Sequence, residues 1–500
     1  MTLPDWIDDR FNPILVKEVR QALRGRYFKV TYGLTLIAAT LVGIVCLMAS
    51  DSNQDIGQTY FVGIYMCMAA AMMGLVPFQA FVAASGSGRG GRAELLQLTA
   101  LRPRQIVAGR LLSSLVQSGL VLAALAPFLA LSFLLPGVDL TVLVFVVVYT
   151  LIFSACVSCV TLSASFLTEN RLLRVLLMVI LGGFQFSLVS SAVAGVSEIL
   201  RNSQDLQDIE AQVALAVFAG VAIFIATFAF IGGTLRISHP EENRSTPLRV
   251  LMFCFALVGM IGTYLAMHFV PHPEAEGFVV AYLALGFAML LPAGIFSGEP
   301  ERLGRRVQVT APKNALVGLL VTPFMPGGGN GALFNLMILG TFGSIMMLFP
   351  TVDPDAGDAW VELFVFSFLW GVTAFNLPSA LLQRWSKHMP VRVLSAFSPG
   401  LFFAATAMVP TFFGLMAGDR DWGDFEHPFC FPWAFERLTR DSYSNKEAIW
   451  AVALLMFVVT VLVNMPRMLR GLKEVQRVSR LRRENEARAK AEKAQEVSAA

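Results

Sequence analysis

The sequence predicts an all-α, polytopic membrane protein with about twelve transmembrane helices and with its N- and C-termini in the cytoplasm. Of its 500 residues, 56% are hydrophobic and only 15% are charged, whereas soluble domains carry roughly 25% charged residues. The hydrophobic residues form runs long enough to cross a bilayer, and Lys and Arg are concentrated between alternate runs. These observations argue against a soluble enzyme.

Residues 1–30 are expected to form a cytoplasmic amphipathic helix that lies in the plane of the membrane interface. Asn12 can cap such a helix and Pro13 can occupy its first turn, with basic residues opposite an apolar side. The candidate interfacial residues are Asn12, Pro13, Lys17, Glu18, Arg20 and Arg24. The alternative is a charged stub that only orients the first span. No cleavable leader is recognisable, so the first span is expected to remain in the mature protein.

Twelve apolar runs are the predicted spans. A helix that crosses about 30 Å of hydrocarbon needs roughly 20 residues and must bond its backbone polar groups internally. The runs cover residues 31–50, 58–84, 110–135, 140–168, 173–194, 213–233, 249–270, 278–297, 331–350, 359–382, 391–417 and 448–465. We expect two six-span modules, 31–235 and 236–465, followed by a basic cytoplasmic tail helix at 466–500.

The distribution of basic residues predicts the orientation. With the N-terminus inside, the outward loops hold only a few of the 38 Lys and Arg residues, and the remainder fall on the cytoplasmic side. The outward ones are Arg201, Arg420, Arg437, Arg440 and Lys446. We therefore expect a multi-pass protein of the inner (cytoplasmic) membrane.

The loop at 85–109 joins the second and third spans. It begins with the Gly- and Arg-rich stretch 85–92 and continues with Glu94–Thr99, which can form a short helix containing three leucines. Pro103 can then start the helix that enters the third span. A short helix between two spans is typical of a docking element, and the alternative is a simple connecting loop.

Together, the N-terminal segment and this loop resemble the type-2 family of ABC transporter permeases, over roughly residues 10–235. Members have an amphipathic helix with the pattern N-P-x-x-x-K-E-x-R, matched here by Asn12, Pro13, Lys17, Glu18 and Arg20. They also have a loop of the form T-L-E-L-L-L-x-T-P-L-S-x-x-x-I-x-x-G-K-L-L. The residues that match this loop are Glu94, Leu95, Leu96, Thr99, Leu101, Ile106, Gly109, Arg110, Leu111 and Leu112.

The resemblance implies the permease subunit of an ABC-type exporter, driven by a separate cytoplasmic ATPase. The implied docking residues are Glu94, Leu95, Leu96, Leu98, Thr99, Leu101, Arg102, Arg104 and Gln105. A second permease copy or paralogue and the lipid bilayer are the other expected partners, and nucleic acid is not expected. Two features depart from the family: Gly and Arg replace its acidic run at 85–92, and residues 236–465 have no counterpart in a six-span permease.

No catalytic, cofactor or metal site is expected in the chain, which we interpret as a transport subunit and not an enzyme. It contains no G-x-x-x-x-G-K-[ST] motif, so the ATP would be used by the partner subunit. Apart from arginines at the ends of the predicted spans, the ionisable candidates within them are Glu362 and His268. Ion-coupled carriers retain ionisable groups at membrane depth. The scarcity of such groups here favours an apolar conduit that is driven by an external ATPase or that carries lipid-like cargo.

Two alternatives remain open. A secondary carrier of the major facilitator kind would also have twelve spans, and Gly298–Arg306 resembles its G-x-x-x-D-R-x-G-R-R loop with one residue fewer. A membrane-embedded scaffold without transport activity is the third class. The substrate is not apparent from the sequence.

Overall fold

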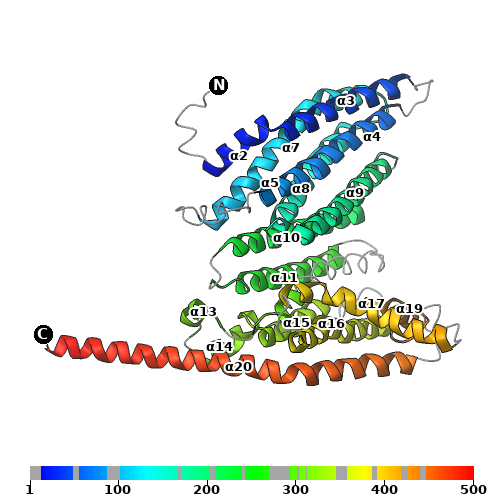
Figure 1. The fold of residues 1–500 in the computed structure, drawn as a ribbon. Coiled ribbons are helices and arrows are strands. Elements are labelled where there is room, and N and C mark those ends of the chain that lie inside the picture. Colours follow the sequence, from blue (N-terminus) through cyan, green and yellow to red (C-terminus); the bar gives the residue numbers. More distant parts are fainter. Residues whose placement is uncertain are drawn as a thin grey trace. The chain divides into compact units, whose positions relative to one another are not determined.

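The computed structural model describes residues 13–48, 56–86, 102–166, 171–201, 209–238, 242–269, 293–300, 303–310, 312, 314–344, 357–385, 391–417, 426–439 and 446–499. Every regular element within these ranges is a helix (Figure 1). Nine of the described helices are long and apolar enough to cross a membrane. The chain is therefore a multi-pass, all-α membrane protein. It divides into two compact units, Met1–Pro240 and Glu241–Ala500, which we describe separately.

The first unit contains six of the nine candidate spans, which coincide with the first six predicted runs. Its elements are α2 (Pro13–Arg24), α3 (Arg26–Met48), α4 (Ile56–Ala69), the π-helix η1 (Ala70–Leu75), α5 (Val76–Gly86), α7 (Pro103–Leu134), α8 (Leu140–Ala164), α9 (Arg171–Arg201) and α10 (Ile209–Ile237). Because α4, η1 and α5 follow one another without a break, they form a single span with a π-helical middle.

The π-helical turn is supported by hydroxyl groups from neighbouring helices. Ser154 of α8 donates a hydrogen bond to the Met72 carbonyl at 2.8 Å, and its Oγ lies 3.0 Å from Ser118 Oγ of α7. A π-turn leaves backbone groups without their usual partners, and a serine at the contact both satisfies such a group and lets helices approach closely. The buried core around it includes Phe61, Ile64, Met68, Met72, Val121, Leu125 and Val146.

The second unit contains the other three candidate spans, in α16, α17 and α20. Its elements are α11 (Thr246–Phe269), α13 (Arg305–Thr310), α14 (Ala315–Val321), the 3-10 turn η3 (Thr322–Phe324), α15 (Gly328–Gly343), α16 (Gly357–Trp385), α17 (Val391–Ala417), α19 (Phe431–Thr439) and α20 (Lys446–Ala499). The predicted span at 249–270 corresponds to α11, whose apolar part is Thr246–Gly262. The span at 331–350 is described as far as residue 344, and 278–297 lies mostly outside the described residues.

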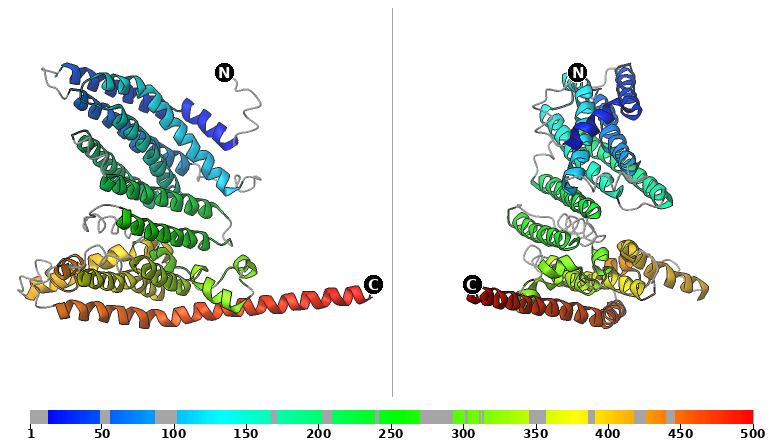
Figure 2. Two further views of the ribbon diagram at one scale, coloured as in Figure 1. Left: turned by 180° about the vertical axis from the view of Figure 1, so that it is seen from behind. Right: turned by 60° about the vertical axis from the view of Figure 1, so that its left-hand side comes forward.

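The last helix, α20, is longer than the predicted span at 448–465. It continues through Pro466 to Ala499 as one helix of 54 residues, and Figure 2 shows it extending past the other helices of its unit. Val475 and Val478 are buried there, where they pack with Leu303, Val307 and Met325. The predicted tail is thus helical, and its first part packs on its own unit.

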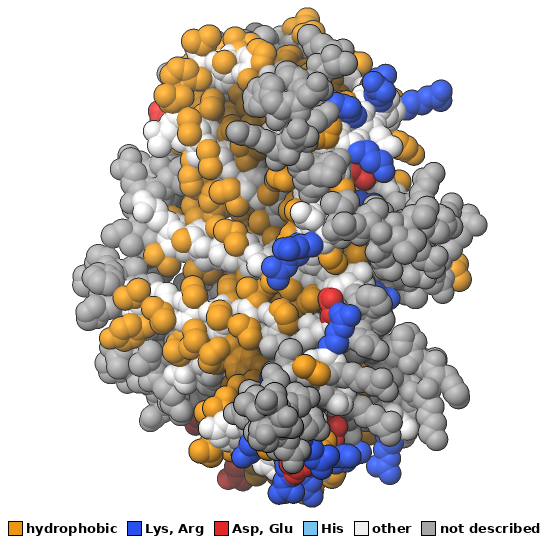
Figure 3. All heavy atoms as spheres, turned by 90° about the vertical axis from the view of Figure 1, so that its left-hand side faces the viewer, with side chains coloured by type: hydrophobic (Ala, Val, Ile, Leu, Met, Phe, Trp, Pro, Cys, Tyr) orange, Lys and Arg blue, Asp and Glu red, His pale blue; other side chains and the backbone are white. Residues whose placement is uncertain are grey.

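The surface is apolar over wide areas. Large hydrophobic side chains are exposed along α3, α9 and α17, including Leu34, Ile37, Val179, Phe186 and Phe412. On the face drawn in Figure 3, hydrophobic side chains are spread broadly and Lys and Arg form separate groups. Lipid is the solvent that accommodates such surfaces.

Candidate functional site

The start of α7 and the N-terminal helix α2 are joined by an ion pair. Arg110 Nε of α7 lies 3.5 Å from the Glu18 carboxylate of α2. The Arg110 side chain is 11% exposed and that of Glu18 is 24% exposed, and the guanidinium lies 5.8 Å from the centre of the Phe166 ring. Two segments separated by more than 80 residues in sequence, each of which carries part of the family resemblance, therefore contact each other.

The helix predicted near the N-terminus is present, and it is shorter than the charged segment. It begins at Pro13 and ends at Arg24, and the Gly25 N–H donates to the Gln21 carbonyl at 3.0 Å. Lys17, Arg20 and Arg24 are exposed on it, whereas Ile14 is buried. Asn12, its predicted cap, lies outside the described residues. The helix thus has a basic exposed side and packs along α7 and α3.

The N-cap and first turn of α7 contain three of the predicted docking residues. Arg102, Arg104 and Gln105 are exposed. The Arg102 N–H donates to Gln105 Oε1 at 2.9 Å, and Pro103 occupies the first helical position. This bond satisfies a backbone donor at the helix start. The other predicted docking residues, Glu94, Leu95, Leu96, Leu98, Thr99 and Leu101, lie outside the described residues.

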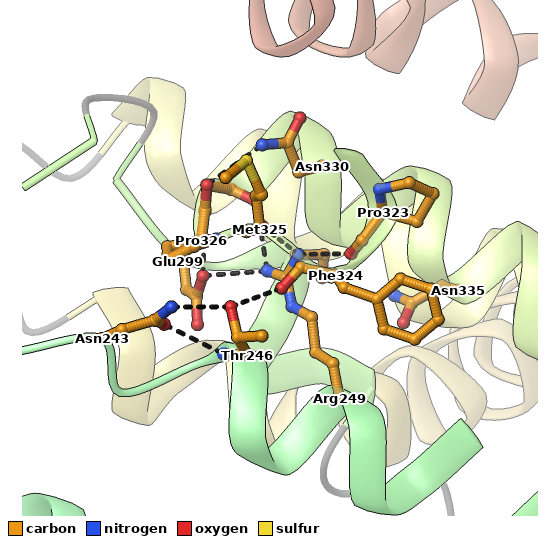
Figure 4. A network of polar contacts seen from close by, with 12 residues as sticks. Asn243, Thr246, Arg249, Glu299, Pro323, Phe324, Met325, Pro326, Asn330 and Asn335 are labelled. Carbon is orange, nitrogen blue, oxygen red and sulfur yellow. Dashed lines mark hydrogen bonds and ion pairs between the residues drawn. The ribbon is translucent and has the colours of Figure 1, made fainter. Parts of the chain in front are cut away.

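A second cluster lies within the second unit and was not predicted. Arg249, in the first turn of α11, is fully buried (Figure 4). Its Nη2 donates to Glu299 Oε2 at 2.8 Å, while Nη1 donates to the Pro323 carbonyl at 2.7 Å and to that of Met325. The guanidinium also lies 5.1 Å from the centre of the Phe296 ring. A buried charge persists only when it is paired and hydrogen-bonded, and both conditions are met here.

The backbone of the turn after η3 hydrogen-bonds both Arg249 and Glu299. Gly327 has a φ of +130°, a conformation that favours glycine. Its N–H donates to Glu299 Oε2 at 3.0 Å, and its carbonyl accepts from Arg249 Nη2 at 3.3 Å. Two further hydrogen bonds lie beside the pair. Thr246 Oγ1 donates to the Phe324 carbonyl and accepts from Asn243 Nδ2 (Figure 4).

A second buried arginine extends the cluster to α16 and α20. Arg467 Nη2 donates to Gln383 Oε1 at 2.6 Å and to the Ser297 carbonyl at 2.8 Å. Gln383 Nε2 in turn donates to the Glu299 carbonyl at 2.9 Å. We call Arg249, Glu299, Gln383 and Arg467 the buried arginine network. It joins α11, the segment before α13, α16 and α20.

Glycines allow the backbones around the network to approach closely. A Cβ on Gly331 would lie 2.0 Å from the Phe296 carbonyl oxygen, and one on Gly329 would lie 2.1 Å from that of Arg467. A Cβ on Gly471 would lie 2.3 Å from Asn330 Oδ1. The glycine run at 327–331 therefore serves helix packing at this junction.

The network corrects one expectation. From the sequence, the interior was expected to be apolar with Glu362 and His268 as its ionisable candidates, yet the structure buries Arg249, Glu299 and Arg467. The Glu362 side chain is 39% exposed and pairs with Lys446 at 3.5 Å, and the side chain of His268 lies outside the description. The expectation was wrong because a charged residue at the end of an apolar run, such as Arg249, was not counted as part of the interior, and a scan of runs cannot detect partners 50 or more residues away.

Two features of the sequence lie at the network. Glu299 is in the Gly298–Arg306 stretch, and the glycine-rich residues 327–331, on which no prediction was based, are of the kind that permits close backbone contact. Neither feature identifies Arg249 as the partner.

The two sites consist of charged groups that position helices relative to one another. Among the described residues, no group of three His, Cys, Asp or Glu side chains could hold a metal ion. The α2–α7 junction and the buried arginine network both connect helix ends through charged groups, an arrangement that can transmit movement between helices.

Comparisons with known proteins do not assign the chain to a family. No family model matches it. No curated protein and no solved structure matches it either.

Proposed function

We propose that the chain is the permease subunit of an ABC-type exporter, driven by a separate cytoplasmic ATPase. The observation that carries the proposal is the Glu18–Arg110 ion pair. Both residues belong to the patterns that resemble type-2 permeases, and the pair ties the N-terminal helix to the helix that directly follows the proposed docking loop. A force applied to residues 94–105 would therefore reach α2 and α7 together.

In this proposal the loop at 94–105 docks onto the ATPase, and α2 lies in the plane of the cytoplasmic interface. The exposed basic side of α2 supports this placement, because anionic headgroups attract such a helix. The membrane helices would switch between two packings, one open to the cytoplasm and one open to the outside. ATP binding by the partner would favour one of these packings over the other. A second permease copy or paralogue would complete the pathway, and both chain termini would be cytoplasmic in the inner membrane. In this proposal ATP is bound by the partner.

Purification from the native host in mild detergent tests the proposal. We expect a polypeptide with a Walker A sequence to be recovered in a fixed molar ratio with the tagged chain. The double variant Leu95→Asp/Leu96→Asp should lose that polypeptide, while the matched control Leu95→Met/Leu96→Met should retain it. Recovery of the chain without any ATPase, with wild-type and both variants alike, would refute the proposal.

A secondary carrier of the major facilitator kind is the second candidate. It is favoured by the buried Arg249–Glu299 pair, because Glu299 lies in the stretch that resembles the loop of that family. A carrier would be purified without an ATPase, and its transport would be abolished by a proton ionophore and unaffected by ATP depletion. A scaffold would show no transport with or without either treatment.

A further inference from the structure

The short helix α14 exposes an apolar side that no other described element covers. Leu316 and Leu320 are 71% and 75% exposed, and Val317 and Leu319 are also exposed. All four belong to a helix of seven residues that contains no charged side chain. Removing large apolar side chains from water is favourable, so an exposed group of four calls for an apolar environment.

The remainder of α14 is held in place, which fixes the direction of its apolar side. Gly318 packs on α20, where a Cβ would lie 3.2 Å from Ser479 Oγ and 3.8 Å from a Val475 methyl carbon. At the start of α14, Asn314 Oδ1 accepts from the Leu316 N–H at 3.3 Å. After its end, Arg249 bonds the Pro323 carbonyl. The helix therefore cannot turn its leucines inward without breaking these contacts.

Helix α14 packs on α20, and the turn that follows it packs on α11; both of these helices also expose apolar residues. At the turn, the Phe324 and Phe253 rings lie edge to face at a centroid distance of 5.4 Å. Val250 of α11 and Leu469 of α20 are themselves exposed. Because α11 is apolar and α20 contains a candidate span, this neighbourhood favours lipid as the environment of α14.

The distribution of charged residues near α14 also favours a lipid environment. Residues 303–352 contain no Asp or Glu, while Arg305, Arg306 and Lys313 lie in that stretch. On the part of α20 that packs against α14, Lys473, Arg477 and Arg480 are exposed. Basic residues beside an apolar helix are attracted to anionic headgroups at the membrane surface.

We propose that α14 is an in-plane anchor whose Leu316 and Leu320 side are immersed in the cytoplasmic leaflet, with the basic residues of α20 at anionic headgroups. Its attachment to Arg249 and α20 would make the position of the second unit sensitive to the lipid surface. The inference depends on residence in a membrane and is independent of the proposed ATPase.

Nitroxide accessibility in the full-length chain tests the anchor. Leu316→Cys and Leu320→Cys, each made in a background without the six native cysteines, are spin-labelled and reconstituted into vesicles of phosphatidylcholine and phosphatidylglycerol. We expect both labels to collide more with oxygen, which concentrates in lipid, than with a water-soluble nickel chelate. The matched control Glu484→Cys, at an exposed position on α20, should show the reverse.

Two outcomes would overturn the anchor. A label at residue 320 that collides mainly with the nickel chelate would place α14 in water, and shielding from both reagents would indicate a protein partner. If the labels lie at the same depth in vesicles of phosphatidylcholine alone, the proposed contact of the basic α20 residues with anionic headgroups is wrong. Should the cysteine-free chain fail to fold, a benzophenone amino acid at position 320 in the native background must form lipid adducts upon irradiation, and adducts to protein alone would refute the proposal.

Discussion

Arg110 and Glu18 form a partly buried ion pair, with 3.5 Å between the guanidinium Nε and the carboxylate, that fastens α2 to α7. Their separation in sequence means that neither segment can adopt its position alone. The contact joins the two segments whose sequences resemble type-2 permeases. The first prediction concerns this contact.

Loss of this pair should loosen the junction. Glu18→Gln should lower stability by about 1 kcal/mol or less, because the pair is partly exposed. Arg110→Ala should cost more, since it also removes packing on Phe166. The exchange Glu18→Arg/Arg110→Glu should recover part of the loss. Apparent melting temperatures in detergent measure these three variants and the double variant Glu18→Gln/Arg110→Ala, and strictly additive effects of its two changes would show that the two residues do not interact.

The buried arginine network predicts a much larger effect in the second unit. Arg249→Met leaves the Glu299 carboxylate buried without its charge partner, and such a change costs about 3–5 kcal/mol. Glu299→Gln should be milder, because Arg249 keeps its carbonyl partners at Pro323 and Met325. Thermal unfolding followed by size-exclusion chromatography measures both.

The exposed pair Arg306–Glu242 provides the matched control for the network. Its side chains are 57% and 44% exposed, so Glu242→Gln should change the melting temperature little. Equal losses from Glu242→Gln and Arg249→Met would mean that burial does not determine the cost.

The close backbone approach at Gly331 predicts a steric effect. Gly331→Ala would place its Cβ 2.0 Å from the Phe296 carbonyl oxygen, and relief requires movement of α15, so we expect a loss of about 1–3 kcal/mol. Gly262→Ala is the control, because a Cβ there meets nothing within 4 Å, and a helical Gly→Ala change is then neutral or stabilising by up to about 1 kcal/mol. A stable Gly331→Ala protein beside a destabilised Gly262→Ala protein would contradict the described packing.

His427 predicts acid sensitivity of the segment before α19. Its side chain is fully buried, its Nε2 lies 3.1 Å from the Ala407 carbonyl and from Thr411 Oγ1, and burial lowers its pKa below the usual 6.5. Above pH 6.5 the imidazole is neutral in folded and unfolded chains, so it adds no pH dependence. Below pH 6.5 the unfolded chain takes up the proton first, and stability should fall by up to about 1.4 kcal/mol per pH unit until the folded pKa is reached.

Melting temperatures measured between pH 7.5 and 5 check this prediction. His427→Gln, which retains a hydrogen-bond donor, should have a flatter profile than the wild type over the acidic part of the range. A profile that is equally steep in the variant would assign the acid sensitivity to other groups.

Hydropathy predicts most of the helices because length and apolar content are local properties. The first six runs coincide with described helices for that reason, and Pro103 indicated the start of α7 correctly. The continuity of the last span with the tail helix was not predicted, because Pro466 suggested a boundary whereas α20 continues through it. The contacts of Asn464 and Arg467 with other helices, which stabilise that stretch, are tertiary and invisible in the local pattern.

The two candidate sites differ in how much of each could be predicted from the sequence. Glu18 could be selected as part of a pattern, but the pairing with Arg110 appears only when α2 packs on α7. Arg249 was invisible, because a single arginine near a helix start is indistinguishable from a residue that sets orientation. Its burial depends on acceptors at residues 299, 323, 325 and 327, which only the folded unit brings together.

Site-specific crosslinking from the proposed docking loop tests the central claim most directly. A photoreactive amino acid replaces Leu96 in the full chain, the native host's membranes are irradiated, and the adducts are identified by mass spectrometry. The proposed function predicts an adduct with a polypeptide that carries a Walker A sequence, and none from the same group at Glu484. Adducts from position 96 with lipid alone, from a chain that remains functional in those membranes, would contradict it.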